Sequence, residues 1–541
     1  MAQWNAQTGV KAFWAIPELV AIAVDFLDVQ SLSQCARVSR AVSEHALNSL
    51  YRKSARLTDI FGLLCPMRTD ATTGTISFIV PLRPAHWTRF RHYNHRIQEV
   101  SVEFFDPQTR SISQKAIIDL LGTQPRQEPF LPSLRRLDWQ DVHPSLNHLV
   151  ILLFHEGLRE LRISLDPSSS TSIMDFLPLR APNLKFLQVW TTRMAEHDSQ
   201  FHNATMEAIQ RLPLVRLRMP PDPLSPGMLS VIAQKRELQS FWGYFFGPET
   251  FRPSTSESYG DSSDMTFPVL RECSVNCGDF LSGLDYFISA PQLVSLHINY
   301  GIQDNISTGL SMLSSLRLKD LMIAIRTWNI GGNQGPPPSP TIDVLRPILA
   351  MSSLEILVIV HPRPPGLSDE DIAELARSLP ELRHIELCGH AREEPSEKVP
   401  TLECFKSLAQ YCRKLISISI WIDASDPPPP ISPNEMAFSS TLEVVYFHSS
   451  KIDRVWDVMA FLVSILPPLT ILEWSPVSRH LRPVIGASEV HFHSLPSAAM
   501  NSCRSKWQEV STLLSSRAQH RRAIQSQRSR IERERENMAH H

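Results

Sequence analysis

A short apolar pattern recurs along most of this chain. Each copy has an apolar residue, two variable residues, a second apolar residue, one variable residue and a third apolar residue. The well-matched copies begin at Leu134, Leu158, Leu184, Leu214, Leu270, Leu293, Leu318, Leu354, Leu382, Leu415, Leu442 and Leu469, and weaker copies begin at Ile97 and Leu238. The alternation that ends each copy predicts a short strand, because successive strand side chains point to opposite faces.

Copies lie roughly 23 to 37 residues apart, and helical patterns such as 369–379 and 402–412 fill the intervals. Strands and helices alternating at this period predict an α/β fold, an irregular leucine-rich-repeat-like solenoid in which each repeat buries its apolar face against its neighbours. A doubly wound α/β domain is the alternative, although its units are rarely so short or so numerous. The polar residue, commonly Asn, that usually follows the strand is replaced in these copies, so the repeats are degenerate.

Before the repeats, three short amphipathic segments are crowded between residues 15 and 52. Pro17 suits the first turn of a helix, where its missing N–H is not needed. The next apolar residues recur at three- and four-residue spacing and predict one stripe, formed by Leu19, Ile22, Phe26 and Leu27.

Two further helices are predicted in the same segment. Ser31 and Gln34 have capping-box spacing at the start of one, and Ser39 can cap the other. Three helices this short cannot bury all their apolar faces among themselves, and a segment of this size normally needs a metal, disulfides or a partner. Either a second protein or the rest of the chain must therefore cover them, and the residues alone leave both alternatives open.

This segment resembles an F-box. The match comprises Ile16-Pro17-Glu18-Leu19, Ile22, Phe26-Leu27-Asp28, Ser31-Leu32, Cys35 to Arg40 and Leu50-Tyr51-Arg52. It departs at Val42, where the family usually has Trp, and at Ser39, often Cys. The resemblance implies docking to a Skp-family adaptor and, through it, to a cullin scaffold in an SCF ubiquitin ligase. The residues at the family's adaptor-facing positions are Ile16, Pro17, Leu19, Ile22, Leu27, Leu32 and Val38.

Residues 78–102 look like the strand and amphipathic helix that lead into the solenoid of divergent fungal F-box/leucine-rich-repeat proteins. With this segment the resemblance covers most of the chain. The predicted organisation is a tail (1–10), an F-box (11–55), a linker and N-terminal cap (56–96), degenerate repeats (97–476), a C-terminal cap (477–500) and a polar, Arg-rich helix (501–541).

Insertions rich in Pro, Gly or Ser interrupt the repeats at 248–266, 329–340 and 423–434, and their composition predicts extended or disordered loops. The stretch 505–538 is strongly polar and Arg-rich, which predicts an exposed, solvated helix.

Composition favours an intracellular protein that does not bind nucleic acid. Lys and Arg number 53 and Asp and Glu 55, so there is no net basic field. The eight cysteines are scattered without a C-x-x-C pair, and no apolar run is long enough for a membrane span. We expect a cytoplasmic or nuclear location.

No catalytic motif is recognisable, and we expect no enzyme activity, cofactor or metal. His491 and His493 could face the same way on a strand but lack a recognisably spaced third ligand. In the repeats the variable positions beside the core residues should line the concave sheet. Aromatic and arginine side chains favour interface hot spots, so the predicted client-binding residues are Arg162, Trp190, Arg218, Trp242 and Tyr244.

The sequence therefore predicts a substrate receptor: the N-terminal helices bind the adaptor, and the repeats bind a protein client. The alternative is a leucine-rich-repeat scaffold without a link to ubiquitin, whose N-terminal helices only cap the solenoid. A hidden enzyme would need a convergent polar site that the sequence does not display.

Overall fold

The computed structural model divides into two compact units, Met1–Tyr244 (unit 1) and Phe245–His541 (unit 2). It describes residues 14, 16–54, 57–72, 74–102, 112–125, 128–140, 144–191, 199–219, 225–245, 267–277, 287, 290–300, 306–325, 338–388, 398–430, 437–448, 450–473 and 502–516.

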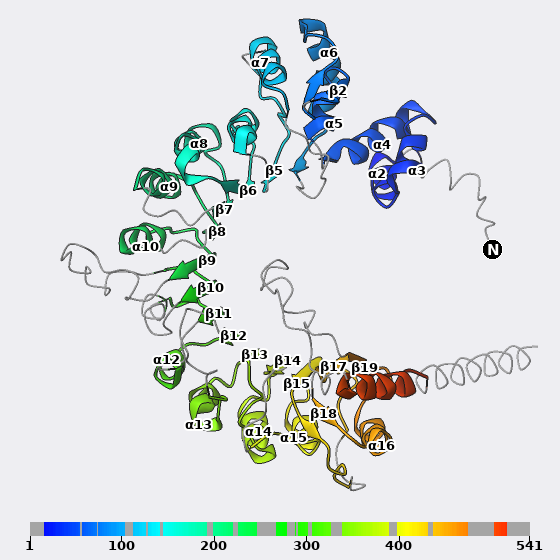
Figure 1. Ribbon diagram of the computed structural model, residues 1–541, viewed down its shortest axis with the longest axis vertical. Helices are drawn as coiled ribbons and strands as arrows, with labels where there is room; N and C mark the ends of the chain where they lie inside the picture. The colour runs from blue at the N-terminus through cyan, green and yellow to red at the C-terminus, as the bar shows by residue number, and fades with distance from the viewer. Residues whose placement is uncertain are drawn as a thin grey trace, which may run out of the picture. The chain divides into compact units, whose positions relative to one another are not determined.

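In unit 1, parallel strands follow one another in the order β1, β4, β5, β6, β7, β8 and β9 (Figure 1). Their bounds are β1 Lys53–Ser54, β4 Glu99–Ser101, β5 Arg136–Trp139, β6 Glu160–Leu165, β7 Phe186–Thr191, β8 Arg216–Arg218 and β9 Ser240–Phe245. A separate antiparallel hairpin pairs β2 (Met67–Thr69) with β3 (Ile76–Phe78).

The helices of unit 1 connect these strands. They are α2 Pro17–Asp25, α3 Val29–Cys35, α4 Arg40–Arg52, α5 Leu57–Gly62, α6 Pro84–Asn94, α7 Gln114–Thr123, the 3₁₀ segment η1 Pro144–Leu153, α8 Pro167–Arg180, α9 Ser199–Arg211 and α10 Pro226–Ala233. From η1 to α10, consecutive helices pack against one another along one side of the strands (Figure 1).

Unit 2 repeats this arrangement in the strand order β10, β11, β12, β13, β14, β15, β17 and β19. The bounds are β10 Glu272–Cys277, β11 Ser295–Tyr300, β12 Asp320–Ile325, β13 Ile356–Val360, β14 His384–Leu387, β15 Ser417–Ile420, β17 Val444–Tyr446 and β19 Ile471–Glu473. Its helices are α12 Ile306–Leu313, α13 Ile342–Leu345, η3 Arg346–Ala350, α14 Asp369–Ser378, α15 Cys404–Tyr411 and α16 Val455–Ile465. The side of the strands opposite the helices is called the strand face in both units.

One apolar position of each repeat aligns across the strands. In unit 1 the aligned residues are Val100, Leu137, Leu161, Leu187, Leu217 and Phe241, and all are buried. In unit 2 the aligned row runs from Cys273 through Leu296 to Leu472. Every copy of the sequence pattern thus contains a strand of the parallel array, which confirms the predicted strands.

A backbone ladder fixes the register at the start of each strand. The carbonyl of Gln98 accepts the N–H groups of Arg135 and Arg136, and the carbonyl of Arg135 accepts those of Arg159 and Glu160. The same arrangement continues to β9 in unit 1 and recurs from β10 to β17 in unit 2. Each repeat thereby satisfies the polar backbone groups of the next.

The C-terminal helix differs from its prediction. Residues 502–516 are helical, but Trp507 and Val510 are buried. The Trp507 ring stacks on Phe447 at 3.9 Å, and its Nε1 donates to the carbonyl of Ser450 at 2.9 Å. A solvated helix was therefore the wrong prediction for 502–516, because this part packs on unit 2.

Several other predicted segments lie partly or wholly outside the described residues. The insertion predicted at 423–434 begins with a two-residue strand, β16 (Asp423–Ala424), which pairs with β18 (Lys451–Ile452). The cap predicted at 477–500, the remainder of the C-terminal helix from 517, and most of the insertions at 248–266 and 329–340 are outside the described part. None of the described helices is long and apolar enough to cross a bilayer.

Candidate protein-interaction site

The N-terminal helices α2, α3 and α4 form a small module with its own core. Val20, Val24, Leu32 and Ala46 are buried against one another. Asp25 of α2 accepts a hydrogen bond from Ser49 and receives two nitrogens of Arg52, both at 3.1 Å, which ties α2 to α4. The Ser49 hydrogen bond, aided by Arg52, lowers the pKa of Asp25 below its usual range, so this carboxylate stays ionised at neutral pH.

The module turns a second set of apolar side chains to solvent. Exposed fractions are 43% for Ile16, 39% for Leu19, 56% for Ile22, 37% for Leu27 and 75% for Val38, and Pro17 is exposed as well. Leu19 and Ile22 share a face of α2 opposite Val20 and Val24, as three-residue spacing on a helix requires. The exposed stripe is defined as Ile16, Pro17, Leu19, Ile22, Leu27 and Val38.

Leu32 does not join this stripe. Its side chain is only 6% exposed, because α3 turns it into the core of the module. Leu32 therefore supports the module from inside, which corrects its assignment as an adaptor-facing residue. Phe26 (86% exposed) and Val29 (70%) are the apolar residues that the predicted set omitted. Phe26 belonged to the predicted apolar stripe, whereas Val29 precedes the helix start that was predicted at Ser31.

Of the two predicted helix starts, the one at Ser39 is confirmed and the one at Ser31 is shifted. Ser39 Oγ accepts the N–H of Val42 at 3.4 Å just before α4, as expected. The helix α3 begins at Val29 rather than Ser31, because the carboxylate of Asp28 accepts the N–H of Ser31 at 2.7 Å and caps it. Both Asp28 and Ser31 are residue types that serve well as N-caps, and Asp28 is the one that caps α3.

A buried arginine joins the module to the repeats. The Arg96 side chain, 3% exposed, donates to Glu44 Oε2 at 2.7 Å and to Asn48 Oδ1. The hydrogen bond that Arg96 donates to Glu44 holds the pKa of Glu44 below its usual value. The chain then runs from α4 directly into β1, which pairs with β4. The module is thus attached to the first strand of unit 1 by side chains and by backbone.

The predicted client-binding residues lie on the strand face of unit 1. Register places Asp138, Arg162, Gln188, Arg218 and Trp242 in one row across five strands. Arg162 and Arg218 are exposed, and Gln188 between them is buried.

The aromatic residues of this face form one cluster. The rings of Trp190 and Trp242 lie 5.4 Å apart, and those of Trp242 and Tyr244 lie 4.9 Å apart, edge to face. Trp190 and Trp242 are half-buried, but Tyr244 is only 7% exposed. Tyr244 therefore mainly supports Trp242, which corrects its assignment as a direct client contact.

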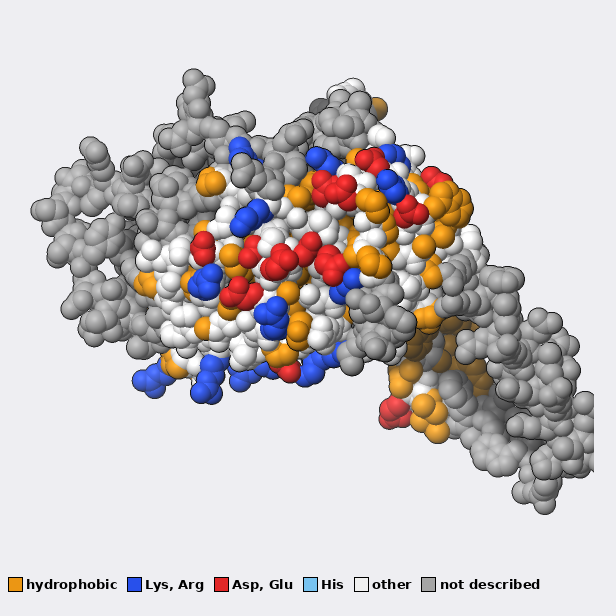
Figure 2. Space-filling model, turned by 90° about the horizontal axis from the view of Figure 1, so that it is seen from below, with side chains coloured by type: hydrophobic (Ala, Val, Ile, Leu, Met, Phe, Trp, Pro, Cys, Tyr) orange, Lys and Arg blue, Asp and Glu red, His pale blue; other side chains and the backbone are white. Residues whose placement is uncertain are grey.

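Charged side chains at the start of the same strands neutralise one another. Arg136 lies 3.5 Å from both Glu99 and Glu160, and Arg216 lies 3.1 Å from Glu160. The guanidinium of Arg216 also stands over the Phe186 ring at 4.6 Å. Figure 2 shows a similar mixture of charges on one face of the molecule, with acidic side chains gathered across its middle and basic ones along its lower edge.

The strand face of unit 2 is built differently. The row in register there runs from Ser274 and His297 through Met322, Val358, Glu386, Ser419 and Tyr446 to Glu473. Its middle members, from Met322 to Tyr446, are buried, whereas Ser274, His297 and Glu473 at its ends are half-buried. Met322, Ala324 and Val358 form an apolar cluster with Ile356 and Val360 at its margin. Tyr446 occupies the variable position near the end of the copy that begins at Leu442, so it was expected to line the concave sheet, but it is only 1% exposed. The middle of this row, from Met322 to Tyr446, is part of the interior of unit 2.

Burial shifts the pKa values of several titratable groups in unit 2. His361, 1% exposed, accepts the N–H of Arg363 on Nδ1 at 3.0 Å, and burial lowers its pKa to about 4. Burial raises the pKa of the Cys412 thiol to about 12 and also raises the pKa values of the Cys388 and Cys404 thiols well above the usual range. These groups are an uncharged imidazole and protonated thiols at neutral pH. Among the described residues no cluster of three or more His, Cys, Asp or Glu is placed to hold a metal ion, and His491 and His493 lie outside them.

Comparisons with known proteins give only distant likenesses. No family model matches the sequence, and no curated protein matches it significantly. Among solved structures, a complex of Rad7 and Elc1 from yeast is similar with 12% identity and a TM-score of 0.29, covering 62% of this chain and 84% of that chain. A leucine-rich-repeat protein of Leptospira interrogans is similar with 12% identity and a TM-score of 0.30, covering 78% and 99%. The functional proposal therefore depends on the geometry of this chain.

Proposed function

We propose that this protein is a non-catalytic substrate receptor of an SCF-type ubiquitin ligase. The helices α2 to α4 would act as an F-box that binds a Skp-family adaptor and, through it, a cullin. The repeats, of leucine-rich-repeat type, would bind a protein client. Ubiquitin transfer is then accelerated by holding two reactants together, which raises their effective concentration. This role places the protein in the cytoplasm, the nucleus or both.

The exposed stripe carries this proposal. Its apolar side chains remain in water although the module already has a complete core from Val20, Val24, Leu32 and Ala46. Burying such a side chain fully is worth about 1.5–3 kcal/mol, so covering the exposed parts would yield roughly 1 kcal/mol for each residue. Five or six such residues would together yield roughly 5–6 kcal/mol, which is of the same order as the cost of association, so other contacts with the adaptor must supply the net affinity.

The client surface proposed in unit 1 consists of Arg162, Trp190, Arg218 and Trp242. Trp and Arg are enriched among residues that dominate binding energy, and their rigid backing by Tyr244 and by neighbouring strands lowers the entropy lost on binding.

Co-precipitation with a purified Skp-family adaptor tests the adaptor site. Leu19→Asp and Leu27→Asp each place a charge in the proposed interface and should abolish capture. Leu179→Asp is the matched control, because Leu179 is 64% exposed on α8, away from the module. Undiminished capture by both module variants would refute adaptor binding through the stripe.

One observation favours the alternative of a scaffold whose N-terminal helices only cap the repeats. Arg96 and the pairing of β1 with β4 attach the module to unit 1, so it covers the end of the strand array. Deleting residues 1–55 should therefore lower the melting temperature under either function. Surface substitutions separate the two, since a simple cap predicts that Leu19→Asp leaves every interaction of the protein unchanged.

A further inference from the structure

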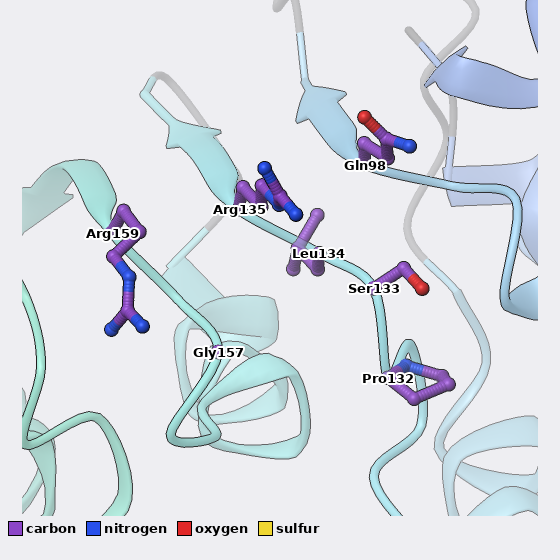
Figure 3. Close-up of a pocket in the computed structure, with 7 residues that line it drawn as sticks. All are labelled: Gln98, Pro132, Ser133, Leu134, Arg135, Gly157 and Arg159. Atoms are coloured by element: carbon purple, nitrogen blue, oxygen red, sulfur yellow. The ribbon is translucent and has the colours of Figure 1, made fainter.

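Two adjoining cavities lie at the start of the first strands of unit 1. The larger, about 450 Å³, is lined by Gln98, Ser133, Arg135 and Arg159 among others (Figure 3). The smaller, about 290 Å³, is lined by Arg52, Arg96, His45 and His95 together with Asp25. Gln98 lines both cavities, and the two together are called the groove. None of the adaptor-facing residues of the stripe lines it.

The repeat itself creates a basic row along this groove. The residue before each strand accepts two N–H groups of the next repeat with its backbone carbonyl. Its side chain takes no part in this pairing. These residues are Gln98, Arg135, Arg159 and Lys185 in successive repeats. Neighbouring strands lie about 4.8 Å apart, so three cations follow one another within roughly 10 Å, about one screening length in physiological salt.

Arg135 is the free cation of the row. No hydrogen bond or ion pair to its guanidinium occurs among the described residues, and the side chain is exposed. Arg159 is held by the carbonyls of Glu156 and Asn183, both at 3.1 Å, and Lys185 pairs with Glu237 at 2.7 Å. Figure 3 shows Arg135 reaching from the start of β5 toward β4 and Gln98.

Acidic side chains do not cancel the charge of this groove. Asp25 offsets Arg52 in the smaller cavity, and Glu44 offsets Arg96. The nearest strand carboxylates, Glu99 and Glu160, are engaged by Arg136. Arg135 and Arg159 thus supply a net positive charge in the larger cavity, beside the amide of Gln98 and the hydroxyl of Ser133.

We propose that this groove binds an acidic peptide segment of a partner protein, with a Glu or Asp carboxylate on the guanidinium of Arg135. Arginine presents parallel N–H donors that match a carboxylate, and a charge-assisted hydrogen bond is stronger than a neutral one. Gln98 and Ser133 line the same cavity and offer an amide and a hydroxyl as further donors. The site lies apart from both the stripe and the aromatic cluster, and it does not depend on the function proposed above.

Fluorescence anisotropy of the full chain tests this site with a fluorescein-labelled peptide of alternating Glu and Ser. We expect salt-sensitive binding, at least fivefold weaker binding by Arg135→Ala and a larger loss by Arg135→Glu. The matched control is Arg180→Ala, because Arg180 is an exposed arginine at the end of α8 in the same unit. It should change the affinity less than twofold. Leu19→Asp should also leave peptide binding unchanged, which separates this site from the adaptor surface.

Four results would overturn the proposal: equal losses in Arg135→Ala and Arg180→Ala, no loss in Arg135→Ala, equal binding of a peptide with Gln in place of Glu, or the absence of peptide binding. A phosphoserine peptide of matched charge that binds more than tenfold tighter would assign the groove to phosphorylated partners instead. Tighter, Arg135-dependent binding of single-stranded DNA would replace the peptide by a nucleic acid. Unchanged melting temperatures of the Arg135 variants exclude misfolding as the cause of a loss.

Discussion

The strand faces of the two units follow the same repeat pattern but differ in what they present to solvent. In unit 1 the face keeps Arg162 and Arg218 exposed beside the half-buried rings of Trp190 and Trp242. In unit 2 the middle of the equivalent row, from Met322 through Val358 and Glu386 to Tyr446, is buried, whereas its ends, such as His297 and Glu473, are half-buried. A repeat of this kind fixes where each side chain stands, and the residue placed there decides whether the surface can recognise a partner. The proposed client surface therefore belongs to unit 1.

Placing a charge in the middle of each strand face should give the largest difference in unfolding free energy between variants of the two units. Val358→Asp places a carboxylate in the apolar cluster of Met322 and Ala324 and should cost at least about 3–5 kcal/mol of unfolding free energy. Arg162→Asp stands in the corresponding row of unit 1 and should cost about 1 kcal/mol or less, because that side chain is exposed. Urea unfolding measures both. Similar losses would mean that the two faces do not differ in burial.

Two tryptophans test the end of unit 2. Trp507→Ala removes a ring that stacks on Phe447 and should cost about 3–5 kcal/mol. Trp456→Ala is the control, because that side chain is 62% exposed on α16, and should cost about 0.5 kcal/mol or less. Thermal unfolding measured by calorimetry distinguishes them. A small loss in Trp507→Ala would show that helix 502–516 is dispensable.

The closed interior of unit 2 also predicts an acid response. His361 has a pKa of about 4 when folded and an ordinary pKa near 6.5 when unfolded, so the unfolded chain binds its proton first as the pH falls. The contribution of neutral His361 to the free energy of unfolding, on the order of 2–3 kcal/mol, is present above pH 6.5 and is lost as the pH falls toward 4. Denaturant unfolding at pH 7 and pH 4.5 should show this loss, and His361→Gln should flatten the pH dependence. An unchanged slope in the variant would assign the response to other groups.

The smallest effect is expected at the exposed face of unit 1. Arg162 lies 3.4 Å from Asp138, but about half of the Arg162 side chain is in water. A double-mutant cycle with Arg162→Ala and Asp138→Ala should give a coupling below about 1 kcal/mol that fades in high salt. A coupling above 2 kcal/mol would indicate a desolvated pair and a closed face.

The strands were predictable because each copy carries the period-2 alternation that a strand needs. The difference between the faces was also visible in part. Two unit 2 strands, DLMIAI in β12 and ILVIV in β13, contain nearly continuous apolar runs, which indicate burial on both faces, whereas RLDW in β5 alternates. The chosen client residues came from unit 1, but Tyr446 of unit 2 was still expected at the concave surface.

Other features left no usable local signal. The two-residue strands β1, β16 and β18 are too short to show a pattern. Arg96 reads as one more polar residue, because its partners Glu44 and Asn48 are about fifty positions earlier. Leu32 matched the family motif while facing the core, since a motif records residue type and not direction.

Trp507 and Val510 did carry a signal, an i, i+3 apolar pair in a polar stretch, which the overall composition outweighed.

Binding of a Skp-family adaptor, measured by isothermal titration calorimetry, tests the central claim most directly. Ile22 is 56% exposed and takes no part in the core of the module, so Ile22→Asp should leave the melting temperature unchanged. The account predicts that the wild-type chain and Leu179→Asp bind the adaptor with equal affinity, whereas Ile22→Asp binds at least thirtyfold more weakly. Equal binding by all three proteins, or no binding by the wild-type chain, would contradict it.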